Sequence, residues 1–416
     1  MGLKNHRGDM TSYDMSQRPR RQSPLLMPLV WGGSYIMTRR HGLKIEKQNM
    51  KGLKPPFLVF ATHHGFSDYY IAPLALFPHR AIYVSDVEGF TAFGKGLYRA
   101  LGCIAKRRYV PDISVIINIR RALKMGQSVV LYPESRHSNI GITAAVPDNL
   151  GKLAKSLGVP VVILSANGSY LANPFWNEEV TRKVPIRARL ECICDKERLS
   201  KVTSDELQRE IEKKLKYNEY EYQQQRGFRI SDRDRAQGLE KALFCCRSCG
   251  KKYGMKTDGS ILSCNYCKRQ WELTEDGRLV SGSESISPPD WYLWQKKLIE
   301  DETKNDMPAR VFPVRTEALP NEKGFVSLGN GTLQLDKEGF TLSFEGDGAK
   351  HLTFPHRIRE SVQTEYNYRG RGCCIVLSTA HCCYYIYSDA PDFSPTELQY
   401  IGEWFYNRSK RGAEKS

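Results

Sequence analysis

Two residues five positions apart, His63 and Asp68, have the side chains of a general-base pair. They lie between an apolar run over 57–61, which predicts a buried strand, and an apolar stretch over 69–77, which predicts a helix. On one continuous helix a spacing of five residues places two side chains about 140° apart. The pair can therefore meet only if His63 lies in the loop and Asp68 in the first helical turn. We expect Ser67 to cap this helix and an ionised Asp68 to hold one imidazole nitrogen, which leaves the other free to accept a proton.

The sequence around this pair supplies a base but no protein nucleophile. The chain contains no Gly-x-Ser-x-Gly elbow, the local sequence that carries the serine nucleophile of α/β-hydrolases. A base without a nucleophile suits a reaction in which a hydroxyl of the substrate attacks. If the pair stood alone, the simpler interpretation would be a loop residue followed by a helix-capping residue.

The elements that must position this pair alternate between strands and helices from about residue 56 to residue 190. Strands are expected at 57–61, 81–84, 128–132, 159–164 and 187–194. Helices are expected at 69–77, 113–125, 150–157 and 204–220. Two of these helices stop at a glycine that directly precedes an apolar strand. This pattern is typical of an α/β layered domain with a central, mostly parallel sheet, which usually places its ligands at the carboxyl ends of the strands.

Four short blocks follow one another over residues 55–195, about a third of the chain. They are Thr62–Asp68, Gly102–Arg108, Tyr132–Arg136 and Val159–Val162. In this order they resemble the four signatures of the PlsC-type glycerolipid acyltransferases, the 1-acyl-sn-glycerol-3-phosphate acyltransferase family. Each block is weak evidence alone, but four in the family's order are specific.

The resemblance implies a role for the residues of the first two blocks. His63 would deprotonate the acceptor hydroxyl, and Asp68 would hold it. Arg108 would bind the phosphate of the acceptor, for which a planar guanidinium is well suited. Arg107 is the alternative for this role, and the simpler interpretation of both is a solvated run of basic residues that begins at Lys106.

The third block would supply Glu134 and Arg136, which by the same resemblance would shape the substrate pocket at the end of a strand. Their simpler interpretation is a structural ion pair. The sequence departs from the family at two points. The third block lacks the usual glycine and is one residue short before its arginine, and Thr62 stands where the family usually has asparagine. These departures leave the acceptor open.

A second candidate site consists of cysteines. Cys246-x-x-Cys249 is followed, after fourteen residues, by Cys264-x-x-Cys267. This spacing predicts a structural zinc ribbon, because four thiolates can surround a zinc ion tetrahedrally and leave no position open for catalysis. A further four cysteines on expected strands are interpreted as core residues: Cys373, Cys374, Cys382 and Cys383.

The charge of the chain favours anionic partners. The net charge is +16, and residues 1–60 hold eleven Lys and Arg against three Asp and Glu. Within this region the apolar run 25–37 is too short for a bilayer, which needs about 20 apolar residues. It predicts either an interfacial anchor on an anionic membrane surface or a helix packed on the core. With no recognisable secretory signal, we expect a peripheral or monotopic protein on the cytoplasmic face of a membrane.

The rest of the chain is expected to form smaller parts. Hairpins at 332–344 and 374–387 and a final helix from Pro395, with Leu398, Ile401 and Phe405 on its buried face, predict a β-rich domain of pleckstrin-homology type. The expected domains are a basic arm and interfacial segment (1–55), an acyltransferase domain (56–225), a zinc ribbon (240–275), a linker (281–323) and the β-rich domain with its helix (324–410).

The leading functional hypothesis is therefore transfer of a fatty acyl group from acyl-CoA or an acyl-carrier protein to lysophosphatidate or a similar lysophospholipid. The acyl thioester is the only co-substrate required, and structural zinc is the only expected metal. Three alternatives stay open: another acceptor on the same fold, a catalytically silent lipid-binding scaffold, and nucleic-acid binding by the ribbon. The last is the weakest, because no recognition helix or aromatic RNA-binding motif accompanies the ribbon.

Overall fold

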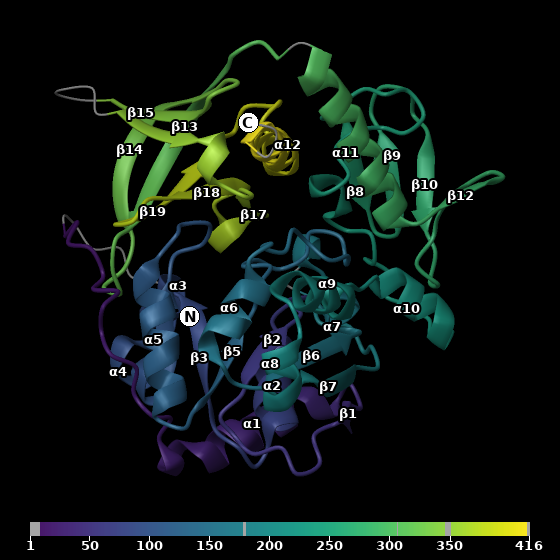
Figure 1. Cartoon of the computed structure of the whole chain (residues 1–416). Helices are drawn as coiled ribbons and strands as arrows, with labels where there is room; N and C mark the ends of the chain where they lie inside the picture. Colours follow the sequence, from purple (N-terminus) through teal and green to yellow (C-terminus); the bar gives the residue numbers. More distant parts are fainter. Residues whose placement is uncertain (1–8, 178–179, 306, 346–350, 414–416) are drawn as a thin grey trace. The chain divides into compact units, whose positions relative to one another are not determined.

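The computed structural model describes residues 9–177, 180–305, 307–345 and 351–413 (Figure 1). The chain forms two compact units. We call the first, residues 14–106 and 112–228, the α/β unit. We call the second the β-rich unit; it contains residues 107–111 and the chain from residue 229 onwards, with residues 9–13 at its N-terminal end. Each unit is described by itself.

The α/β unit is built on one seven-stranded sheet of order β1-β7-β6-β2-β5-β3-β4. Its strands are β1 (Lys44–Gln48), β2 (Leu58–Ala61), β3 (Ala81–Asp86), β4 (Cys103–Lys106), β5 (Ser128–Leu131), β6 (Val161–Asn167) and β7 (Arg187–Cys194). All neighbouring strands are parallel except β6 and β7. The predicted α/β domain with a mostly parallel sheet is confirmed.

Helices cover both faces of this sheet. They are α1 (Met27–Arg39), α2 (Asp68–Leu76), α3 (Val87–Phe93), α4 (Lys95–Ala100), α5 (Ile113–Lys124), α6 (Leu150–Leu157), α7 (Ser169–Ala172), α8 (Lys196–Lys201), α9 (Ser204–Leu215) and α10 (Glu219–Arg226). Single 3-10 turns occur at Pro24–Leu26 and Phe175–Asn177 in this unit.

Strand β2 shows why the sequence 57–61 is apolar throughout. Leu58 and Phe60 pack with the buried residues of α5, α6 and α9, whereas Val59 and Ala61 pack with those of α2. Because successive side chains of a strand point to opposite faces, a strand covered by helices on both sides must be apolar at every position. This central strand carries the candidate base at its carboxyl end.

Two expected elements differ from the structure. The single helix expected over 204–220 is two helices, because Lys216 is extended (ψ 130°) and the Asn218 side chain caps α10 by accepting from two backbone N–H groups. The basic arm expected over 1–55 is not separate, because β1 pairs with β7 and α1 buries Met27 against the unit. No helix among the described residues is long and apolar enough to cross a membrane.

The β-rich unit contains two antiparallel sheets. The smaller has the order β12-β11-β10-β9-β8, with strands β8 (Met255–Asp258), β9 (Ile261–Cys264), β10 (Gln270–Leu273), β11 (Leu279–Ser281) and β12 (Glu284–Ile286). The larger, of order β16-β15-β14-β13-β19-β18-β17, comprises β13 (Arg310–Leu319), β14 (Val326–Leu335), β15 (Gly339–Phe344), β16 (His351–Pro355), β17 (Gln363–Glu365), β18 (Cys374–Ser378) and β19 (Cys383–Tyr387).

Helix α12 (Pro395–Ala413) packs against strand β17 of the larger sheet. Leu398 and Ile401 of this helix are buried, and Phe405 stacks on His356 with ring centroids 4.9 Å apart. The predicted antiparallel β domain with a final helix is confirmed, and its likeness to pleckstrin-homology domains stays a prediction. The 3-10 turns of this unit are Leu239–Lys241, His356–Ile358 and Tyr368–Gly370.

The prediction of a linker over 281–323 is wrong. This stretch holds β12, β13 and the eighteen-residue helix α11 (Pro288–Asn305). The Ser287 hydroxyl accepts from the backbone N–H of Asp290 (3.2 Å), and proline is well tolerated in the first turn that follows. Trp291 and Ile299 then lie on the buried face of α11. The Ser- and Pro-rich sequence that suggested a linker is the start of a helix.

Candidate active site

His63 and Asp68 meet in the way their spacing requires. His63 follows β2 in a loop, and Asp68 is the first residue of α2. Both side chains are buried, and His63 Nδ1 lies 3.4 Å from Asp68 Oδ2. This distance is longer than the usual hydrogen bond of about 2.9 Å. The predicted cap is wrong: Ser67 has helical angles and makes no capping hydrogen bond.

Asp68 is held by donors on both of its oxygens. Oδ2 also accepts from the backbone N–H groups of His64 (2.6 Å) and Gly65 (3.0 Å), and Oδ1 accepts from the Ser169 hydroxyl (2.9 Å). Burial by itself raises the pKa of Asp68, but the hydrogen bond with His63 and the charges of His64 and His63 lower it below its usual value. An ionised Asp68 favours a proton on His63 Nδ1, which leaves Nε2 as the basic nitrogen.

Ser169 is a site residue that the sequence analysis missed. It is the first residue of α7, which follows the end of β6. Because β6 and β2 are parallel neighbours, the loops after their carboxyl ends lie together. The position of Ser169 after an expected strand was the signal that could have identified it.

Glu134 binds the backbone of His63 through its side-chain carboxylate. Oε1 accepts from the backbone N–H of His63 (3.1 Å), while Oε2 accepts from the N–H of Ala144 (2.7 Å) and the Tyr217 hydroxyl (3.0 Å). Burial raises the pKa of Glu134. The side chain therefore shapes the site by fixing the loop that carries the base. The other third-block residue, Arg136, is also buried and donates to Asn139 Oδ1 (2.8 Å).

Aromatic rings surround the His63 imidazole. Ring centroids lie 4.4 Å away in His137, 4.5 Å in Tyr132 and 5.7 Å in Tyr69. Phe66 packs edge-on against His137 (5.0 Å) and is 49 % exposed. His137 directly follows the third block, and nothing in its local sequence indicated a position beside His63. The imidazole of the candidate base therefore lies beside a partly exposed aromatic rim.

His64, the neighbour of the candidate base, is a structural residue. Its Nδ1 lies 2.9 Å from Glu219 Oε1, both side chains are fully buried, and Tyr217 stacks on its ring at 3.6 Å. Burial by itself lowers the pKa of His64, but the charge and hydrogen bond of Glu219 raise it above its usual value. Glu219 also accepts from the backbone N–H of Gly168 (2.7 Å). This buried ion pair distinguishes the two histidines: His64 Nδ1 already has a carboxylate partner in Glu219, and His63 stays the candidate base.

The structure places the arginines of the second block in the β-rich unit. Arg107 is 1 % exposed. Its guanidinium donates to the backbone carbonyls of Pro320 (2.9 Å), Ala380 (2.9 Å) and His381 (2.8 Å). Arg108 pairs with Glu365 at 3.4 Å. None of these contacts is with His63 or Asp68, so the phosphate-binding role of Arg108 stays a prediction.

Lys106 is the cation of the second block that belongs to the α/β unit. It ends β4, and its Nζ donates to the hydroxyl of Ser135 in the third block (3.0 Å). The parallel strands of the sheet bring their carboxyl ends to one edge. The second and third blocks thus meet through Lys106 at the edge where β2 carries His63.

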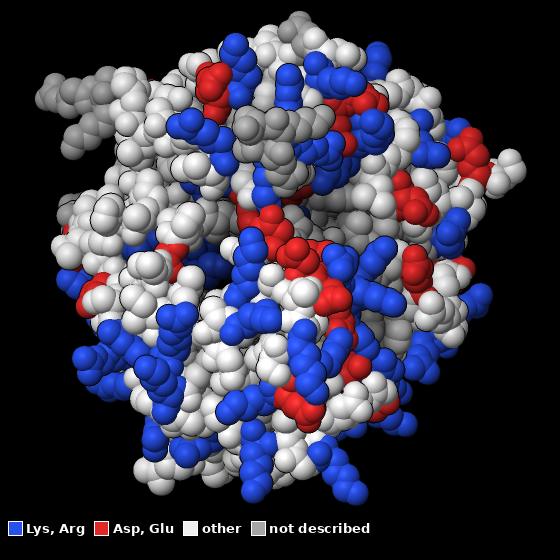
Figure 2. All heavy atoms as spheres, in the orientation of Figure 1, with Lys and Arg blue, Asp and Glu red and all other residues white. Residues whose placement is uncertain are grey.

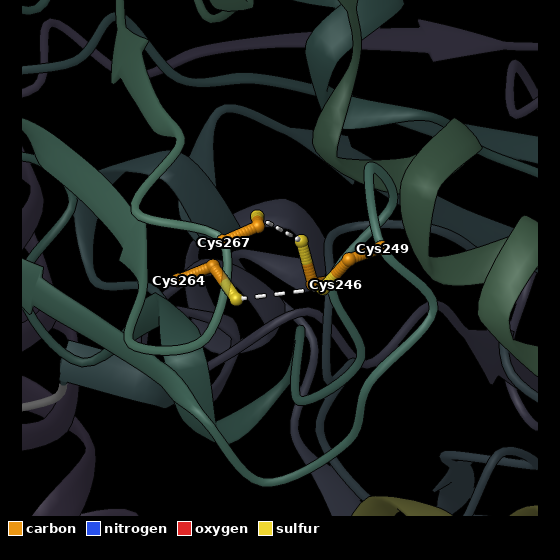
Figure 3. A group of neighbouring side chains, drawn as sticks. All are labelled: Cys246, Cys249, Cys264 and Cys267. Carbon is orange, nitrogen blue, oxygen red and sulfur yellow. Dashed lines mark hydrogen bonds between the residues drawn. The ribbon is translucent and has the colours of Figure 1, made fainter.

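The four predicted metal ligands also come together, in the β-rich unit. The Sγ atoms of Cys246, Cys249, Cys264 and Cys267 all lie within 4.8 Å of one another (Figure 3). The expected core cysteines Cys374, Cys382 and Cys383 are buried, and Cys373 is half-buried.

The buried ion pair between His64 and Glu219 predicts a pH-dependent stability. The pKa of His64 is raised above the unfolded value of about 6.5. Its stabilisation is therefore fully present below about pH 6.5 and is lost as pH rises through the raised pKa. We expect His64→Gln to lower the free energy of unfolding by on the order of 3 kcal/mol at pH 6, and by less at pH 9. Urea unfolding across this range measures the difference; a difference that grows with pH would contradict the assignment.

Comparisons with known proteins place the four blocks in one family segment. Residues 41–165 match the protein-family model described as Acyltransferase. No protein of curated function matches the chain. One similar solved structure is the 1-acyl-sn-glycerophosphate (LPA) acyltransferase PlsC from Thermotoga maritima, which is 18 % identical; the match covers 45 % of this chain and 76 % of that chain with a TM-score of 0.38. The segment that carries His63 and Asp68 thus matches the acyltransferase family.

Proposed function

We propose that the protein transfers a fatty acyl group from acyl-CoA or an acyl-carrier protein to the free hydroxyl of lysophosphatidate or a similar lysophospholipid. The observation that carries the proposal is the contact between buried Asp68 and His63, within the segment that matches the acyltransferase family. A base with no nucleophile of its own suits attack by a substrate hydroxyl on a thioester. The aromatic rim beside His63 suits the hydrocarbon chain of either substrate.

The reaction uses His63 twice. Its Nε2 takes the proton of the acceptor hydroxyl as the hydroxyl oxygen attacks the thioester carbonyl, while Asp68 stabilises the imidazolium through Nδ1–H. The tetrahedral intermediate then collapses: the C–S bond breaks, the ester C–O bond remains, and the thiolate takes the proton from His63. Glu134 keeps the imidazole in place through the backbone of His63. No metal takes part in these steps.

We assign the first contact with the acceptor phosphate to Lys106. Its ammonium lies at the carboxyl edge of the sheet next to Ser135, and a flexible cation of this kind suits a phosphate. Arg107 does not suit the role, because it is buried and its guanidinium is already bound by three carbonyl oxygens. Arg108, the position that the resemblance indicates, is the rival. Arg136 supports the pocket from a buried position.

An anionic membrane surface is the proposed source of the acceptor. Helix α1 buries Met27 and Thr38 on one face, while Leu29 and Ile36 on another are 73 % and 58 % exposed. The helix therefore combines both expectations, a packed face and an apolar face open to the surroundings. Lysine and arginine side chains are spread over the face shown in Figure 2. Together these features suit binding to anionic lipid at headgroup level.

Thiol release from acyl-CoA, measured with lysophosphatidate vesicles, tests the reaction. We expect acceptor-dependent release by the wild type and a fall of about 10²–10⁴-fold in both His63→Ala and Asp68→Asn, the usual contribution of a general base. The exposed His79→Ala is the matched control and should keep full activity. Circular dichroism establishes that each variant is folded. Absence of release by the wild type with acyl-CoA and with acyl-carrier protein would eliminate lysophosphatidate as the acceptor, and the same result with other lysophospholipids would eliminate the proposal in favour of a silent scaffold.

The assignment of the acceptor phosphate to Lys106 predicts a different KM for the variants Lys106→Ala and Arg108→Ala. Lys106→Ala should raise the KM for lysophosphatidate by about tenfold or more, which corresponds to the loss of one charge-assisted hydrogen bond of about 1.5–3 kcal/mol. Arg108→Ala should change it less. Steady-state kinetics with varied acceptor and saturating donor separate KM from kcat. A large rise in KM with Arg108→Ala alone would transfer the role to Arg108, as the resemblance implies.

The exposed face of α1 predicts binding to anionic vesicles. Leu29→Glu combined with Ile36→Glu should weaken binding to phosphatidylglycerol-containing vesicles, measured by sedimentation, by about tenfold or more. Each change removes an exposed apolar side chain whose burial in lipid would contribute about 1.5–3 kcal/mol, and each adds a charge that anionic lipid repels. Leu293→Glu, at an exposed leucine of the β-rich unit, is the control. Equal sedimentation of the double variant and the control would show that α1 is not the binding surface.

A further inference from the structure

We propose that the β-rich unit binds one structural zinc ion and that this ion fixes the loop that holds the start of helix α12. The ligands are the four cysteine thiolates Cys246, Cys249, Cys264 and Cys267. This inference does not depend on the proposed acyl transfer.

The distances between the sulfur atoms fit a tetrahedral zinc site. Cys246 Sγ lies 3.7 Å from Cys267 Sγ, and Cys249 Sγ lies 3.8 Å from Cys264 Sγ. A zinc–sulfur bond of about 2.3 Å in a tetrahedron places neighbouring sulfurs about 3.8 Å apart, whereas a disulfide joins them at about 2.05 Å. Figure 3 shows the four side chains converging from two loops. The geometry is that of metal ligands and not of disulfide partners.

The two loops that supply the ligands have the same backbone. In the first, the N–H of Gly250 donates to the carbonyl of Cys246 (2.8 Å); in the second, the N–H of Lys268 donates to the carbonyl of Cys264 (2.9 Å). In each loop the N–H of the first cysteine also donates to the carbonyl five residues on, at 2.9 and 3.0 Å. Each loop therefore presents two thiolates from an equivalent turn, although their sequences share little beyond the cysteines.

The second loop contains a lysine in a conformation that costs free energy, and metal binding would offset this cost. Gly250 and Lys268 occupy equivalent positions and both have left-handed angles, with φ of 72° and 61°. Glycine adopts this conformation freely, but it costs an ordinary residue such as lysine about 1–2 kcal/mol. Four thiols facing one another do not offset this cost, because a thiol is only a weak hydrogen-bond donor. A metal bound by the thiolates does so, since a structural zinc site contributes its binding free energy to folding.

The zinc loop continues directly into contacts with α12. Lys252 and Tyr253 follow the first loop, and Glu397 lies in the first turn of α12, 1 % exposed. Lys252 Nζ lies 2.9 Å from Glu397 Oε1, and the Tyr253 hydroxyl donates to Oε2 (2.6 Å). Arg310 of β13 donates to the same Oε2 (2.9 Å). Because a buried carboxylate is costly without partners, the start of α12 depends on the loop that the metal fixes.

Metal analysis of the full-length protein, purified under reducing conditions without added metal, tests the site. We expect about one zinc per chain in the wild type and less than a tenth of this in the Cys264→Ser/Cys267→Ser double variant. Cys373→Ser, a half-buried cysteine outside the cluster, is the matched control and should keep its zinc. Iron in place of zinc, which four thiolates also bind, would overturn the proposal. So would a wild type that contains no metal and takes up none when zinc is added.

Hydrogen exchange tests the connection to α12 and needs no enzymatic activity. Removing the metal from the wild type with a mercurial thiol reagent and a chelator avoids reliance on a variant that fails to fold. We expect exchange to rise by about tenfold or more in β8, β9 and the first turn of α12, and to stay unchanged around His63. Glu397→Gln should raise exchange in α12 while the zinc content stays at one. Unchanged exchange in α12 after complete metal removal would refute the connection.

Discussion

The candidate site depends on buried carboxylates that hold one loop. The loop over 62–68 carries the candidate base, and its backbone N–H groups and imidazoles bind Asp68, Glu134 and Glu219. A buried carboxylate is costly unless it accepts several hydrogen bonds, and removing one partner leaves the others poorly satisfied. The three carboxylates come from α2, from the loop after β5 and from α10. The position of His63 is therefore determined by elements far apart in the chain and not by its local sequence.

The sequence indicated those parts of the site that depend on neighbours along the chain. His63 and Asp68 could be paired from sequence because they flank the junction of a strand and a helix, and the sheet could be predicted because apolar strands covered on both faces need apolar residues throughout. Glu219 could not be found, since its partner His64 lies 155 residues away. His137 and Ser169 were also missed: the order of the strands brings His137 to His63 and Ser169 to Asp68, and only for Ser169 did a position after an expected strand give a signal.

Arg107 is an example of local sequence suggesting the wrong environment. A run of three basic residues resembles a solvated surface, yet this guanidinium is buried against three backbone carbonyls of distant turns. Carbonyl oxygens satisfy its donors without a carboxylate, so no acidic residue in the sequence indicates the contact. As a result the chain leaves the α/β unit after Lys106 and returns at Asp112. The β-rich unit therefore contains Arg107 and Arg108 of the second block, and a truncation before residue 229 would leave Arg107 without these carbonyl acceptors.

The smaller sheet of the β-rich unit differs from the two seven-stranded sheets, which both pack on apolar clusters. The α/β unit has two apolar clusters, one on each face of its sheet, and such cores need no cofactor. The smaller sheet of the β-rich unit has strands of three or four residues, which are too short for independent stability without packing or a metal. Its buried Trp271 and Trp291 pack edge-to-face at 5.0 Å, and Trp291 donates to the carbonyl of Cys245, next to the first cysteine of the cluster. The tryptophan pair therefore connects the short strand β10 to helix α11, and the hydrogen bond from Trp291 connects α11 to the loop that begins the four-cysteine cluster.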